Sequence, residues 1–143
     1  APFLIGPDEE SAQWVEGIAS KCGAPFTVLR KTRHGDRKVS IEVPNLSAWK
    51  GRQPVLVDDI ASSGRTLIEA ARQIGSQGLT KPTCVVVHAL FVEGAYAELS
   101  ILAGRVVSTN SVKHVSNTIS LVDTILDAMR ERAIPPQARK FGS

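Results

Sequence analysis

Hydrophobic and polar positions along this chain alternate between two patterns. Short apolar runs predict strands at residues 2–5, 26–29, 55–57, 83–90 and 105–107, and residues 39–43 alternate as a half-exposed strand does. Apolar residues at helical spacing predict helices at residues 9–22, 66–75, 93–102 and 119–129. Because strands and helices follow one another in turn, the pattern predicts an α/β fold with a mostly parallel central sheet flanked by helices.

The same pattern predicts where the domain lies and which residues fill its core. Residues 1–133 carry the strands and helices, and residues 134–143, which contain two adjacent prolines, are expected to form a loosely ordered tail. Trp14 falls on the apolar side of the first helix and is expected in the core. Cys22 and Cys84 are expected to be small core residues and not a disulfide or metal pair, which is consistent with a reducing, cytoplasmic location.

Charge and composition exclude several classes of partner. The net charge is +3, with basic residues concentrated at 30–38 and 130–140, but no aromatic residues are interleaved with them for base stacking. We therefore expect no nucleic acid partner. No apolar stretch is long enough to span a bilayer, so we expect no membrane partner either. Residues 30–38 are predicted to form a mobile basic loop between two strands.

Residues 54–71 read as a strand, a tight loop and a helix, which is the order of an anion site. Asp58 and Asp59 end the apolar run, and the loop that follows consists of small or hydroxylated residues around Arg65. Such a loop lets backbone N–H groups at a helix N-terminus converge on a phosphate. The segment matches neither the Walker A loop nor Gly-x-Gly-x-x-Gly. The two carboxylates suit either two ribose hydroxyls or a hydrated Mg²⁺.

This segment resembles the phosphoribosyl-diphosphate (PRPP) motif of type I phosphoribosyltransferases and of ribose-phosphate pyrophosphokinases. The resemblance implies the three-layer fold of that class, with Asp58 and Asp59 binding the ribose 2- and 3-hydroxyls. It also implies that the loop binds the 5-phosphate through Ala61, Ser62, Ser63, Gly64, Arg65 and Thr66. Arg65 stands where a glycine is common, and its side chain either points to solvent or adds a cation near the phosphate.

Four elements in order resemble the C-terminal half of a ribose-phosphate pyrophosphokinase. They are Gly6–Asp8, Lys31–Arg33, Asp58–Thr66 and Thr109–Ser111. The resemblance implies transfer of a diphosphoryl group from MgATP to ribose 5-phosphate, giving PRPP and AMP. It further implies that Lys31 and Arg33 neutralise the triphosphate, that Asp8 lies near the diphosphate and Mg²⁺, and that the protein forms dimer-based homo-oligomers.

The resemblance also has departures and alternatives. Gly6 replaces a serine of the family, and Glu9–Ser11 stands where glycines are common. His88 and His114 are expected to be structural. Since the family's enzymes are about twice this length, we expect a fragment without the ATP-binding N-terminal half, able to bind ribose 5-phosphate or PRPP with little or no turnover. Two alternatives remain open: a phosphoribosyltransferase acting on a nucleobase, and a non-catalytic homologue associated with PRPP synthetase.

Overall fold

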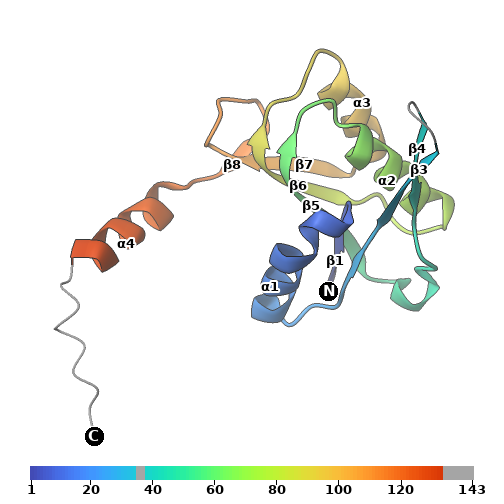
Figure 1. The fold of residues 1–143 in the computed structure, drawn as a ribbon, viewed down its shortest axis with the longest axis horizontal. Coiled ribbons are helices and arrows are strands. Elements are labelled where there is room, and N and C mark those ends of the chain that lie inside the picture. Colours follow the sequence, from blue (N-terminus) through green and yellow to red (C-terminus); the bar gives the residue numbers. More distant parts are fainter. Residues whose placement is uncertain (35–37, 134–143) are drawn as a thin grey trace, which may run out of the picture.

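The computed structural model describes residues 1–34 and 38–133, and of residues 31–34 and 38–40 it describes the backbone only. Six parallel strands form one sheet in the order β2-β1-β5-β6-β7-β8 (Figure 1). These strands are β1 (Pro2–Gly6), β2 (Phe26–Val28), β5 (Gln53–Ala61), β6 (Thr83–Ala89), β7 (Arg105–Thr109) and β8 (Asn117–Ile119). A separate antiparallel pair consists of β3 (Arg30–His34) and β4 (Lys38–Glu42).

Helices cover both faces of the sheet, which confirms the predicted three-layer α/β fold. The helices are α1 (Ala12–Cys22), α2 (Arg65–Ser76), α3 (Ala95–Leu102) and α4 (Val122–Ala133), with short 3₁₀ turns η1 (Glu9–Ser11) and η2 (Ser47–Trp49). Helix α1 lies on one face, α2 and α3 lie on the other, and α4 projects away from the sheet after β8 (Figure 1). No helix among the described residues is both long enough and apolar enough to cross a membrane.

The apolar runs of β1 and β5 are buried on both faces of the sheet. Phe3 and Leu56 are fully buried in the larger cluster, which they share with apolar residues of α2 and α3. Leu4 and Val57 face the opposite side and pack with Val15 of α1. Continuous apolar runs are the pattern expected of parallel strands covered by helices on both sides, and this arrangement fixes the carboxyl ends of β1 and β5 beside each other.

Helix α2 begins at the loop after β5, and its side chains form hydrogen bonds with the β3–β4 hairpin and the residues that follow it. Its apolar side is buried, as its spacing predicted, at Leu67, Ile68, Ala70, Ala71 and Ile74. On its outer edge the Gln73 side-chain amide donates to the backbone oxygen of Ile41 in β4 at 2.7 Å. The Gln77 side chain bonds to the backbone at Pro44 and Leu46, at 3.0 and 2.9 Å. The base of the hairpin is therefore fixed to the helix that begins at the 61–66 loop.

The expectation of a loop over residues 30–38 is wrong for most of that segment. Residues 30–34 and residue 38 belong to β3 and β4, which pair with each other and not with the main sheet. Residues 35–37 lie outside the described part of the chain, and the mobility of the segment stays a prediction. The sequence pattern did not predict this strand because its side chains are charged. A strand in an antiparallel hairpin outside the main sheet does not need apolar residues on both faces.

Two further expectations, for Ile119 and Cys22, differ from the structure. Ile119 lies in the edge strand β8 and not in the last helix, because α4 begins at Val122. Cys22 is exposed, whereas Cys84 is buried as predicted, and both are free thiols. The apolar stripe of α4 is exposed, and the exposed fraction of Met129 is 63%.

Trp14 is half-buried and packs against the smaller core cluster, which confirms its predicted place. The expected tail, residues 134–143, lies outside the described residues.

Candidate functional site

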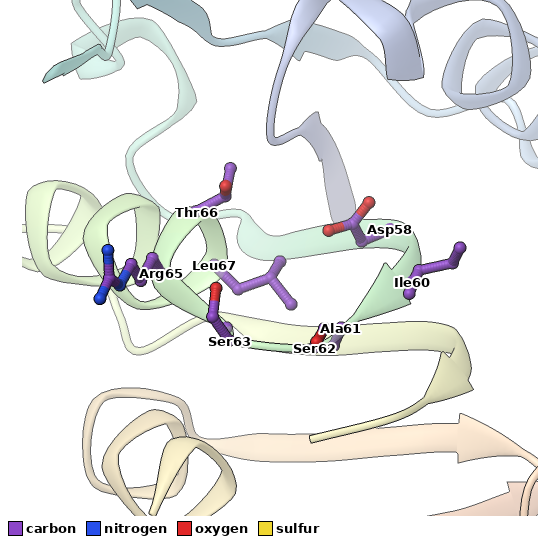
Figure 2. Close-up of a pocket in the computed structure, with 9 residues that line it drawn as sticks. Asp58, Ile60, Ala61, Ser62, Ser63, Arg65, Thr66 and Leu67 are labelled. Carbon is purple, nitrogen blue, oxygen red and sulfur yellow. The ribbon is translucent and has the colours of Figure 1, made fainter. Parts of the chain in front are cut away.

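A pocket of about 140 Å³ lies over the loop between β5 and α2. It is lined by Asp58 and by the continuous segment from Ile60 to Leu67 (Figure 2). Strand β5 extends further than predicted, to Ala61, so Asp58 and Asp59 lie within its second half. The pocket therefore sits at the carboxyl end of a central parallel strand, where ligands of open α/β sheets bind.

Helix α2 begins at this pocket without a side-chain cap. Its N-cap residue is Gly64, which has a left-handed backbone at φ 66° and makes no capping side-chain bond. The first backbone bond of the helix runs from the Ile68 N–H to the Gly64 oxygen at 2.8 Å. The N–H groups of the first turn therefore remain available, and together with the helix dipole they favour an anion. Ser62 and Ser63 are exposed on the same loop.

Gly64 lies between α2 and the start of α3, where an added Cβ would make ordinary van der Waals contacts. A Cβ at this position would lie 3.4 Å from Ile68 Cδ1 and 3.5 Å from the Ala95 Cβ at the start of α3. Its positive φ is a conformation that glycine adopts more readily than other residues do. Arg65, the next residue, is exposed, and Figure 2 shows its guanidinium directed away from the Asp58 carboxylate. This orientation matches the solvent-facing alternative for Arg65.

Asp58 and Asp59 occupy different environments despite being adjacent. Asp58 is half-buried and lines the pocket, whereas Asp59 is exposed and does not. The Asp58 carboxylate accepts a hydrogen bond from the Asp59 N–H at 3.0 Å. Burial, reinforced by the negative charges of Asp59 and Asp8, raises the pKa of Asp58 from an ordinary 3.8 to about 7. Because the charges of Asp59 and Asp8 act on Asp58, a cation or hydroxyl donors at Asp58 would relieve the repulsion.

The raised pKa of Asp58 predicts a loss of stability as pH increases. Between pH 3.8 and 7 the unfolded chain ionises Asp58 while the folded chain keeps its proton, so stability falls with rising pH and the deficit is constant above about pH 7. We expect Asp58→Asn to have the same free energy of unfolding as the wild type at pH 4 and a higher one at pH 8. Both are measured in buffer that contains a metal chelator and no ligand. The expected gain is on the order of 2 kcal/mol, allowing for partial solvent exposure.

Urea unfolding at both pH values measures this difference. Asp123→Asn, an exposed acid on α4, is the matched control and should show no gain at pH 8. Equal stability of Asp58→Asn and the wild type at pH 8 would show that the Asp58 carboxylate is well solvated.

Asp8 lies at the carboxyl end of β1, the strand beside β5. It is the N-cap of η1, and its Oδ1 accepts from the Ser11 N–H at 3.1 Å. Within residues 1–34 and 38–133 no group of three or more acidic, histidine or cysteine side chains is arranged to hold a metal ion. Mg²⁺ usually takes only one or two carboxylates and keeps several waters. The neighbouring oxygen donors of Asp8 and Asp58 fit such a partly hydrated ion.

Gly6 and Ser11 depend on each other sterically. A Cβ at Gly6 would collide with Ser11 Oγ, which donates to the Asp8 backbone oxygen at 2.5 Å. We expect Gly6→Ala to destabilise the chain by about 1–3 kcal/mol through overpacking. Adding Ser11→Gly should recover most of that loss, as a double-mutant cycle of thermal unfolding would show. Gly17→Ala, at a position with open space around it, is the control. Additive effects of the two substitutions would contradict this coupling.

Lys31 and Arg33 both lie on β3. Their Cα partners in β4 are Ile41 and Val39. Because the side chains of residues 31–40 fall outside the description, the relation of these two cations to the pocket stays a prediction. What the structure adds is a fixed base for their hairpin, through the Gln73 bond to Ile41.

A second segment lies against the pocket. In the β6–α3 connection the Leu90 N–H donates to the Ala61 oxygen at 3.0 Å, and the Val92 N–H donates to the Ser62 oxygen at 3.1 Å. Leu90 falls within the strand predicted at residues 83–90, whereas Val92 lies beyond it. The Thr109–Ser111 element lies at the carboxyl end of β7, where Thr109 Oγ1 donates to the Val87 oxygen at 2.6 Å.

Residues 1–127 match the family described as the phosphoribosyl transferase domain. The chain belongs to this family. Among its curated relatives is the ribose-phosphate pyrophosphokinase of Sulfolobus acidocaldarius, 32% identical over 127 residues that cover 85% of this chain and 43% of the relative. The resemblance to ribose-phosphate pyrophosphokinases is therefore confirmed, and the chain spans about half the length of the curated relatives it matches.

Solved structures show the same fold. The phosphoribosylpyrophosphate synthetase of Mycobacterium smegmatis superposes with a TM-score of 0.73 at 20% identity, over 92% of this chain and 45% of the other. The orotate phosphoribosyltransferase of Aeropyrum pernix gives a TM-score of 0.56 at 25% identity, over 90% of this chain and 65% of the other.

Proposed function

We propose that this chain is the ribose 5-phosphate-binding part of a ribose-phosphate diphosphokinase. The observation that carries the proposal is the half-buried Asp58 beside the uncapped N-terminus of α2. A carboxylate is suited to accept hydrogen bonds from ribose hydroxyls, and free N–H donors are suited to bind a phosphate. The proposal places the 2- and 3-hydroxyls at Asp58 and Asp59 and the 5-phosphate on the 61–66 loop.

The proposed reaction needs both positioning and neutralisation of charge. The ribose 1-hydroxyl oxygen attacks the β-phosphorus of ATP, the bond from that phosphorus to the α–β bridging oxygen breaks, AMP leaves, and the hydroxyl proton is lost. Charge develops on phosphoryl oxygens, so cations directed at them accelerate the step. The proposal assigns this role to Lys31 and Arg33. Arg supplies a planar fork for two oxygens, whereas Lys supplies a compact charge.

Mg²⁺ is the proposed cofactor, with Asp8 as its main protein ligand and Asp58 close by. When bound, it would neutralise the charge of the diphosphate. The Ser11 N–H bond to Asp8 Oδ1 orients this carboxylate, and the second oxygen remains for the ion or its waters.

The full protein is proposed to be longer than this chain, because the curated relatives are about twice as long. Under this proposal the ATP site is completed outside the present sequence, the protein acts in the cytoplasm, and it assembles as dimer-based homo-oligomers. The 143-residue chain should bind ribose 5-phosphate or PRPP and show little or no turnover by itself.

Phosphorus NMR tests the proposal directly. The longer protein and the 143-residue chain are each incubated with Mg²⁺, ATP and ribose 5-phosphate. AMP and PRPP appearing with the longer protein alone would support a diphosphokinase whose ATP site lies partly outside this chain. No product from either would contradict the proposal.

The alternatives predict other results in the same assay. A phosphoribosyltransferase would release diphosphate from PRPP only when a nucleobase is added, and the likeness to an orotate phosphoribosyltransferase favours this as the second candidate. A non-catalytic homologue would bind PRPP or ribose 5-phosphate and release no product under either condition.

A further inference from the structure

Helix α4 carries an exposed apolar stripe. Val122, Ile125, Leu126 and Met129, here called the α4 stripe, are 40% to 63% exposed. Their spacing of three and four residues places them on one side of the helix. Neither core cluster of the described residues includes any of them, and the helix projects away from the sheet (Figure 1). A helix with one apolar side normally buries that side against another element.

Helix α4 is too short to be stable by itself. It has 12 residues, and every residue from 122 to 132 is exposed. Isolated helices of this length are marginal in water, because most of the stability of a helix comes from packing of its apolar side. The ion pair between Arg130 and Asp127, at 3.2 Å, is exposed and adds little. We therefore expect α4 to be fully formed only where the α4 stripe is covered.

The start of α4 is fixed to the edge of the sheet that carries the candidate site. The Leu121 N–H donates to Asn110 Oδ1 at 2.9 Å, and the Asn110 N–H donates to the Ile119 oxygen at 2.9 Å. Asn110 directly follows β7, and Ile119 ends β8. Because all six strands are parallel, β5, β7 and β8 end at the same edge. Helix α4 therefore leaves the sheet at the edge where the Asp58 pocket lies.

The charges of α4 argue against a lipid surface as its partner. Helices that lie in a membrane interface carry mostly lysine and arginine on their polar side. Helix α4 instead carries three acidic and two basic residues, which are Asp123, Asp127, Glu131, Arg130 and Arg132. An anionic surface would repel this helix at least as much as it attracts it. The chemistry of the α4 stripe therefore fits an apolar protein surface.

A second copy of this chain is a poor partner for the α4 stripe. Two α4 helices packed together would meet over less than two heptads, whereas a stable helix pair uses three to four. Specific dimers bury about 800 Å² on each partner, which is more than one short stripe supplies. A segment of the same polypeptide needs less area, because its tether gives an effective concentration in the millimolar range.

The curated relatives contain such a segment. This chain covers 43% of one relative and 47% of another, so more than half of their length lies outside the present sequence. We propose that α4 is the docking helix for the remainder of the longer protein, and that the α4 stripe holds this remainder at the carboxyl edge of the sheet. The existence of the longer protein rests on the proposed function, whereas the exposure of the α4 stripe does not.

Amide hydrogen exchange tests the docking without any ligand. In the 143-residue chain the amides of residues 126–132 should have protection factors below about 10 at every protein concentration. In the longer protein their protection should be at least about 100-fold higher. The Val86 amide in the buried strand β6 should be protected in both. Equal exchange of residues 126–132 in the two proteins would overturn the proposal.

Two substitutions at neighbouring positions separate the α4 stripe from the opposite side of the helix. Ile125→Asp puts a charge into the stripe, whereas Thr124→Asp, the matched control, lies on the other side. In the longer protein, Ile125→Asp should return the exchange of residues 126–132 to the level of the 143-residue chain. Thr124→Asp should leave it within about twofold of wild type. Equal protection in the two variants would contradict docking through the stripe.

The same two variants have a different expected result in the 143-residue chain. Both side chains are exposed there, so neither substitution should change its thermal unfolding. If Ile125→Asp prevents folding of the longer protein, the milder Met129→Ser should still lower the protection of residues 126–132 about tenfold. No loss of protection in Met129→Ser would then overturn the proposal.

The outcomes separate this proposal from the proposed function. Protection of α4 in a longer protein that forms no AMP or PRPP would leave the docking role intact and contradict the diphosphokinase. Turnover by a longer protein whose α4 amides stay unprotected would contradict the docking role alone. Protection of α4 in the 143-residue chain would also overturn the docking role. If that protection rises with concentration, a second copy covers the α4 stripe, and if it does not, another segment of this chain does.

Discussion

Replacing Lys31 and Arg33 together by alanine in the longer protein should lower kcat by about 10³-fold, the scale of losing a cation that stabilises a phosphoryl-transfer transition state. Affinity for ribose 5-phosphate should change by less than roughly threefold, because the sugar phosphate is proposed to bind at Asp58 and the 61–66 loop. Single-turnover formation of AMP measures the first quantity, and calorimetric titration measures the second.

Arg30→Ala is the matched control for this pair. Arg30 is an exposed cation at the start of the same strand, and its loss should leave kcat within about twofold of wild type. If the double variant retains full turnover, these two residues do not contact the transferred group. A protein that only binds PRPP or ribose 5-phosphate would have no turnover to lose, so the result also separates the enzyme from the non-catalytic alternative.

The double change Asp58→Ala, Asp59→Ala should weaken ribose 5-phosphate binding by at least about 100-fold. Each carboxylate is proposed to accept hydrogen bonds from ribose hydroxyls, and bonds to a charged acceptor contribute roughly 1.5–3 kcal/mol each. The measurement is calorimetric titration of the 143-residue chain with ribose 5-phosphate in Mg²⁺. Removing Asp58 also removes a destabilising charge, so the variant should fold at least as well as the wild type at pH 8.

Two further variants serve as controls for that experiment. Asp58→Asn, Asp59→Asn keeps the side-chain size and loses the charge, and it should bind nearly as poorly. Asp127→Asn on α4 should bind as the wild type does. Full affinity in the alanine double variant would mean that the sugar binds elsewhere, and the assignment of this site would be wrong.

The strand–loop–helix of residues 54–71 was predictable because each part carries its own local signal. An apolar run, two acids, a small-residue loop and a helical stripe lie next to one another in sequence, and no distant residue is needed to place them. The structure changes only where β5 ends. The α/β order of the main sheet follows in the same way from alternating apolar patterns.

The hairpin was not predictable because tertiary contacts decide it. Residues 30–34 carry three basic side chains and read as a loop, yet they pair with β4, whose Ile41 backbone is fixed by Gln73 of α2.

The place of β1 inside the sheet has a consequence for how the chain folds during synthesis. Phe3 of β1 pairs with Pro54 of β5, about 50 residues later, so at roughly 5–20 residues per second the ribosome releases β1 several seconds before this neighbour exists. During that interval an apolar strand is exposed with one edge unpaired, which is a state prone to aggregation. Chaperone dependence should therefore be greatest for nascent chains that end before residue 61.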